Sequence, residues 1–173
     1  WEDIGTIRSF FDANIALTDP VPAFNMFDNE EQIYTRPRML APSKVFGTFF
    51  NQAIIAEGCI VNAKQIDHAI IGLRSRIGPD TEISNAIIMG NDYYETMAEL
   101  ENLGSTPAMG IGSGCYIRNA IIDKDCRIGN NVRIHGSASL EDTETSTYMI
   151  RDGIIVTRKG AVIPPGTRIG LQS

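Results

Sequence analysis

Residues 65–88 read QIDHAIIGLRSRIGPDTEISNAII, and an aliphatic residue returns in this segment every five or six positions. The same rhythm runs from Ile54 onward and resumes close to the C-terminus. Neither the 3.6-residue period of an α-helix nor the alternation of a β-strand produces such a pattern over this length, so it is an internal repeat. The residues that mark it are Ile55, Val61, Ile66, Ile71, Ile77, Ile83, Ile88, Ile111, Ile117, Ile122, Ile128, Ile134, Ile163 and Ile169.

In the clearest units, residues 77–82, 111–116 and 128–133, isoleucine precedes glycine and a turn. This pattern resembles the hexapeptide repeat of left-handed parallel β-helices. The resemblance implies that each aliphatic residue points inward and stacks on its equivalent one coil away, at the strand spacing of about 4.8 Å. Of the 25 isoleucines, 21 lie at or after Ile54, and we expect them to form the core of this solenoid. The predicted fold class is therefore all-β.

The remaining segments divide the chain further. Apolar residues spaced three and four apart predict a helix within residues 1–17, with Asp3 or Thr6 as its N-cap. Residues 18–53, which contain four prolines, are expected to form an extended linker before a β-helix domain over 54–173. Polar interruptions at about 91–109 and 135–150 are expected to project as loops.

Composition narrows the classes of function. A net charge of −6 gives the chain as a whole no electrostatic attraction to nucleic acid or to an anionic membrane. No apolar run approaches the roughly 20 residues of a membrane span. Three cysteines without CxxC spacing favour reduced thiols in an intracellular protein. Because the chain begins at Trp1, we also expect it to be a piece of a longer protein.

A β-helix alone leaves the function open, because acyltransferases, sugar nucleotidyltransferases and structural modules share the fold. Five other segments are more specific: WEDIGTI at 1–7, IYTRPRMLAPSK at 33–44, YYET at 93–96, AIIDK at 120–124 and GIIVTRK at 153–159. Together they resemble the C-terminal portion of ADP-glucose pyrophosphorylases, the glucose-1-phosphate adenylyltransferases of glycogen and starch synthesis.

The resemblance implies a nucleotidyltransferase domain, a linker and a β-helix that assemble into a tetramer, in a bacterial cytoplasm or a plastid stroma. Residues 1–17 match the last edge of that catalytic domain. The glycine-rich loop that would cradle a triphosphate is not in this sequence, and residues 110–114 fall inside the repeat, where we expect a structural turn. The isolated chain is therefore expected not to make ADP-glucose.

The resemblance also implies particular site residues. The family joins ATP to glucose 1-phosphate with release of pyrophosphate, using Mg²⁺, and Asp3 matches a metal-binding carboxylate. Lys124 and Lys159 match lysines that bind phosphorylated metabolite effectors and phosphate, and Arg36 and Arg38 match a linker pair that also contributes to anion binding. A common plant pattern has glutamine at the first of these linker positions, so the identity of the activator stays open, as does homo- or hetero-oligomerisation.

Two other hypotheses remain. One is a β-helix acyltransferase that uses acetyl-CoA, with His135 at the edge of an insertion as its general base. The other is a purely structural oligomerisation module. A lone histidine is more often structural, and the same holds for His68 beside Asp67. Tyr93 and Tyr94 are expected to anchor their loop by packing.

Overall fold

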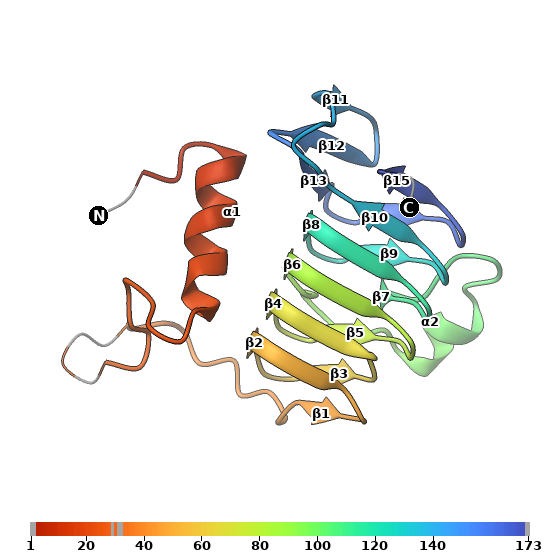
Figure 1. The fold of residues 1–173 in the computed structure, drawn as a ribbon. Helices are drawn as coiled ribbons and strands as arrows, with labels where there is room; N and C mark the ends of the chain where they lie inside the picture. The colour runs from red at the N-terminus through yellow and green to blue at the C-terminus, as the bar shows by residue number, and fades with distance from the viewer. Residues whose placement is uncertain (1–2, 29, 31–32, 172–173) are drawn as a thin grey trace.

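The aliphatic rhythm corresponds to stacked parallel strands in the computed structural model, which describes residues 3–28, 30 and 33–171. Six short strands form the first face of a three-sided coil, in the order β1, β3, β5, β7, β9 and β14 (Figure 1). Their bounds are β1 (Lys44–Val45), β3 (Ile60–Val61), β5 (Arg76–Ile77), β7 (Gly110–Ile111), β9 (Arg127–Ile128) and β14 (Val162–Ile163). The predicted fold class, a left-handed parallel β-helix preceded by one helix, is confirmed.

The other two faces share four seven-residue strands: β2 (Phe49–Ile55), β4 (Gln65–Ile71), β6 (Glu82–Ile88) and β8 (Tyr116–Ile122). Each strand bends at its middle residue, which has a positive φ of 45° to 49° and is Gln52, His68, Asn85 or Asn119. The first halves form the second face with β10 (Arg133–His135) and β15 (Arg168–Gly170). The second halves form the third face with β13 (Ile154–Thr157).

The solenoid core consists of equivalent side chains from successive coils. Ile66, Ile83 and Ile117 are in register on the second face and are at most 1% exposed. Each fully buried aliphatic side chain contributes about 1.5–3 kcal/mol. No single coil encloses such a side chain, so the core depends on stacking.

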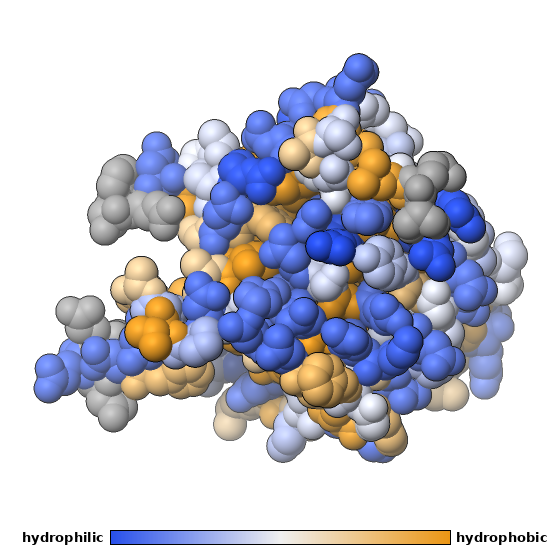
Figure 2. Space-filling view, in the orientation of Figure 1, coloured by the Kyte–Doolittle hydropathy of each residue, from blue (hydrophilic) through white to orange (hydrophobic). Residues whose placement is uncertain are grey.

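The third face carries a second row of isoleucines that points outward. The triplets 69–71, 86–88 and 120–122 each read Ala-Ile-Ile. The alanine and the last isoleucine of each belong to the solenoid core. The first isoleucine belongs instead to a second apolar cluster, which contains Phe11 of α1 (Ile7–Ile15). The expectation that all these isoleucines line the solenoid interior was therefore wrong. Helix α1 lies along this row, and an apolar seam is visible between helix and strands (Figures 1 and 2).

Helix α1 begins after Thr6, whose side chain accepts from the Ser9 amide while the Ser9 side chain accepts from the Thr6 amide. Thr6, and not Asp3, is therefore the N-cap. A 3₁₀ turn (Ala16–Thr18) follows, and the described residues from 19 to 43 contain no helix or strand.

The β-helix begins ten residues before the expected boundary at Ile54. Val45 pairs in register with Val61, and Phe50 pairs with Ile66, so residues 44–55 already form the first coil. Phe50 occupies the inward position of this first coil in place of isoleucine and packs, partly buried, against the solenoid core.

Both interruptions of the repeat leave the solenoid and return to it. Residues 91–109 contain the short helix α2 (Met97–Glu101). The second contains β11 (Thr143–Glu144) and β12 (Tyr148–Arg151), which pair antiparallel with each other, and β12 also pairs antiparallel with β13. Among the described residues, no helix is long and apolar enough to cross a membrane.

Candidate functional site

Lys124 and Lys159 occupy the same position in two successive coils, at the corner between the third and first faces. The ladder shows the equivalence, because the Gly160 amide donates to the Lys124 carbonyl (2.8 Å) and the Asp125 amide donates to the Gly90 carbonyl (3.2 Å). The two lysine backbones are thus one coil apart, about 4.8 Å. The structure brings together two of the four cations expected at an effector site.

A single carboxylate lies between these lysines. Lys124 Nζ is 2.7 Å from Asp92 Oδ1, and Lys159 Nζ is 2.6 Å from Asp92 Oδ2. Asp125 Oδ2 lies 3.5 Å from Lys159 Nζ, and its other oxygen accepts from the Asp92 amide. Two ammonium groups and two carboxylates thus make this corner nearly neutral. We call these four residues the lysine corner.

Asp92 and Lys159 each stabilise the charged form of the other. Hydrogen bonds from Lys124 and Lys159 lower the pKa of the Asp92 carboxyl to about 2, and the hydrogen bond to Asp92 raises the pKa of Lys159. At neutral pH the Asp92 carboxylate and the Lys159 ammonium group are therefore charged.

Asp92 is the second residue of the first insertion, whose beginning is fixed to neighbouring coils. Asn91 Nδ2 donates to the Arg74 carbonyl (2.9 Å), and an Arg74 guanidinium nitrogen donates to the Asn91 carbonyl (3.2 Å). Two residues after Asp92, Tyr94 donates its hydroxyl proton to the Gly58 carbonyl (2.8 Å). Tyr94 thus anchors its loop through a hydrogen bond and not through burial, because Tyr93 and Tyr94 are both exposed.

A buried ion pair fixes the rest of the insertion. Glu95, whose side chain is 1% exposed, lies 2.6 Å from Arg127 NH1 and accepts from the Met109 amide at 2.7 Å. Arg127 also donates to the Pro107 carbonyl. The two ends of the insertion are thus joined to each other and to β9. Sequence reasoning missed Asp92 and Glu95, since neither has a place in the repeat that would indicate its partner.

Arg36 and Arg38 lie outside the lysine corner. Both are exposed on the irregular segment before β1, and their one mutual contact runs from an Arg38 guanidinium nitrogen to the Arg36 carbonyl. The segment reaches the solenoid at Ala41, whose carbonyl accepts from the Gly58 amide. Gly58 lies on the same edge as the lysines but three coils before Lys124, about 14 Å away.

Asp3 does not form a metal site on its own. Its carboxylate accepts from the Gly5 amide at 3.0 Å, and no cluster of three or more potential metal ligands occurs among the described residues. A magnesium ion takes several oxygen ligands, often from substrate phosphates as well as carboxylates. The residues present here therefore do not fit a complete Mg²⁺ site.

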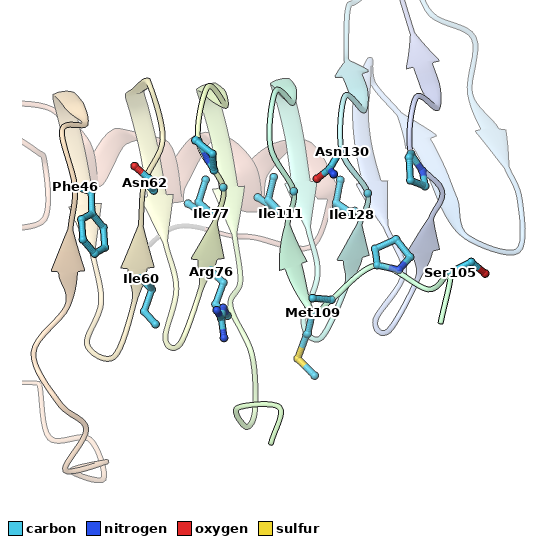
Figure 3. Close-up of a pocket in the computed structure, with 17 residues that line it drawn as sticks. Phe46, Ile60, Asn62, Arg76, Ile77, Ser105, Met109, Ile111, Ile128 and Asn130 are labelled. Atoms are coloured by element: carbon cyan, nitrogen blue, oxygen red, sulfur yellow. The ribbon is translucent and has the colours of Figure 1, made fainter. Parts of the chain in front are cut away.

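A hollow of about 560 Å³ lies on the first face beneath the returning end of the insertion (Figure 3). Ile60, Pro107 and Met109 contribute to its lining, and Arg76 is its one charged lining residue. This apolar surface is less suited to a phosphate group than the lysine corner.

The contacts of the two histidines favour a structural role for both. His135 stacks edge-on against Tyr116, and burial lowers its pKa, with a smaller contribution from Arg118. Its Nδ1 has no hydrogen-bond partner among the described residues, so no carboxylate orients it as a general base. His68 Nδ1 lies 3.3 Å from Asp67, and its Nε2 lies 3.8 Å from Asp19.

Comparison with known families agrees with this fold. Residues 38–168 match the model of the GLGC left-handed parallel β-helix domain, the C-terminal domain of ADP-glucose pyrophosphorylase. The chain belongs to this family. The match covers more than half of the sequence and includes every member of the lysine corner. The GLGC domain is part of a nucleotidyltransferase family, which favours that function over the acyltransferase hypothesis.

Proposed function

We propose that this chain is the C-terminal regulatory and assembly part of a glucose-1-phosphate adenylyltransferase, and that its lysine corner binds the phosphate group of an effector. The observation that carries the proposal is the stacking of Lys124 and Lys159 at one corner, with both ammonium groups directed at the same anionic group.

The chemistry of the corner suits a phosphate. A phosphate monoester offers several oxygens to charged donors, and two lysines supply a pair of charge-assisted hydrogen bonds. Arg36 and Arg38, exposed on the segment before β1, would add positive charge when that segment lies near the ligand. The proposed ligands of the lysine corner are phosphorylated three- to six-carbon metabolites and inorganic phosphate.

Titration calorimetry with 3-phosphoglycerate, fructose 1,6-bisphosphate and inorganic phosphate tests this site. The Lys124→Gln/Lys159→Gln variant should lose binding of the ligand that binds the unmodified protein, while Lys64→Gln, a lysine on another corner, should retain it. If the double variant and the unmodified protein bind with equal affinity, the lysine corner is not the effector site.

The catalytic proposal concerns the enzyme that contains this chain. There, Asp3 would hold Mg²⁺ together with ligands from outside this chain, and the ion would offset phosphate charge in the reaction between ATP and glucose 1-phosphate. The isolated chain is expected to bind an effector but to make no ADP-glucose. Synthesis of ADP-glucose by the purified 173-residue chain would contradict this assignment. The proposed compartment is a bacterial cytoplasm or a plastid stroma.

Exposed apolar side chains on the first coil support the proposal that the chain assembles with other subunits. Val45, Phe46 and Phe49 are 44%, 44% and 63% exposed there, at the end of the solenoid. Exposed apolar side chains beside edge strands, here β1 and β2, favour contact with another protein surface. Light scattering on a Phe49→Ser variant tests this proposal: we expect a smaller assembly than that of the unmodified protein, and an unchanged mass would contradict it.

A further inference from the structure

The Asp92 carboxylate holds the two lysines that are proposed to hold the effector. Each of its oxygens receives one ammonium group, at 2.7 Å from Lys124 and 2.6 Å from Lys159. Two neighbouring oxygens of a phosphate offer the same pair of acceptors. We propose that Asp92 is an internal competitor of the effector: it occupies the lysine corner in the ligand-free protein and leaves both lysines when a phosphate group binds. This inference rests on the proposed function of the lysines.

The charges of the corner require such an exchange. Asp92 and Asp125 together offset both ammonium groups, so a phosphate that approached the intact corner would meet no net positive charge. Once Asp92 has rotated away, the two lysines face only Asp125, which contacts Lys159 alone. The low pKa of Asp92 agrees with a carboxylate that these lysines hold in its charged form.

The exchange needs little rearrangement of the chain. The side chains of Asp92, Lys124 and Lys159 are 42%, 39% and 58% exposed, so solvent and ligand reach them directly. Ion pairs at such a surface cost little to open.

Neighbouring contacts confine the movement to the Asp92 side chain. Asn91 is fixed to Arg74, and Tyr94 and Glu95 are fixed to Gly58 and Arg127. Rotation of the Asp92 side chain alone breaks none of these contacts. The insertion therefore keeps its shape while the two lysines exchange the Asp92 carboxylate for the ligand.

The Asp92→Asn variant tests the inference, because it removes the charge and keeps the size of the side chain. Calorimetric titration with inorganic phosphate, at fixed ionic strength, compares it with the unmodified protein. We expect at least about fivefold tighter binding by Asp92→Asn, at the lower end of typical couplings between competing ligands. Glu141→Gln is the control: it makes the same change in net charge from an exposed position in the other insertion, and its affinity should equal that of the unmodified protein.

Different outcomes separate the two proposals. If Asp92→Asn binds phosphate with equal or lower affinity while Lys124→Gln/Lys159→Gln loses binding, the competitor role is wrong and the lysine site stands. If the double lysine variant binds as well as the unmodified protein, or if no protein binds phosphate, both proposals are overturned. If Glu141→Gln gains as much affinity as Asp92→Asn, the effect belongs to net charge, and the competitor role is again wrong.

Discussion

The two pairs of cations that the family resemblance assigns to anion binding differ in how the fold holds them. Lys124 and Lys159 occupy equivalent rungs of the ladder, so backbone hydrogen bonds between coils determine their separation. Arg36 and Arg38 lie on an irregular segment, with no ladder to set their direction. A solenoid thus positions charges by stacking, whereas Asp92, the carboxylate between the two lysines, is supplied by an insertion. The following predictions compare residues placed by the ladder with residues outside it.

The largest expected difference concerns stability. Ile117 is fully buried at the centre of the core, and Tyr34 on the segment before β1 is 91% exposed. Ile117→Ala should lower the free energy of unfolding by about 2–5 kcal/mol, from lost burial and the cavity left behind. Tyr34→Ala should change it by less than about 0.5 kcal/mol. Urea denaturation of both variants measures the contrast, and equal losses would show that residues 33–43 are packed as firmly as the coils.

The second prediction concerns the buried pair that fixes the first insertion. Glu95→Gln should cost about 2–3 kcal/mol, below the cost of breaking a fully buried pair because Arg127 is partly exposed. Glu101→Gln, on exposed α2 of the same insertion, is the control and should be neutral. Hydrogen exchange should also accelerate at the Met109 amide in Glu95→Gln alone. An unchanged exchange rate there would mean that other contacts hold the insertion.

The third prediction compares the two cation pairs directly. Lys124→Gln/Lys159→Gln should weaken phosphate binding about tenfold or more, the effect of losing charge-assisted hydrogen bonds. Arg36→Gln/Arg38→Gln should weaken it less, since these side chains do not face the corner. The same calorimetric titration measures both. A larger loss for the arginine pair would mean that the linker, and not the ladder, forms the principal anion site.

The smallest effect on stability is expected from the titration of Asp92. Its pKa is lowered in the folded protein, so its stabilising contribution is present above its ordinary pKa of 3.8 and is lost as the pH falls through about 2. Carbon-detected NMR of the Asp92 carboxyl should show a midpoint of about 2. In Lys124→Gln/Lys159→Gln the midpoint should rise toward 3.8. An unchanged midpoint in that variant would show that other groups lower the pKa.

The sequence predicted the repeat well because the solenoid needs one inward aliphatic residue on every side of a coil. It misplaced the start of the domain where Phe50 replaces isoleucine, and it did not separate the inward from the outward residues of each Ala-Ile-Ile triplet. Both distinctions depend on tertiary position: the first coil provides the edge strands of both sheets, and α1 covers the third face.

The lysine corner was only partly predictable. Lys124 lies two residues after inward Ile122, but the equivalent position before Lys159 is Thr157, a buried polar residue that interrupts the rhythm. Its hydroxyl accepts from the Asp123 amide, which explains a threonine inside the coil. Asp92 could not be predicted, because the insertion has no period that relates it to the lysines.

The most direct test of the central claim is a crystal structure of the protein grown with inorganic phosphate. We expect a phosphate between Lys124 Nζ and Lys159 Nζ, with the Asp92 carboxylate turned away from both. A phosphate bound elsewhere, with Asp92 still contacting both lysines, would contradict it.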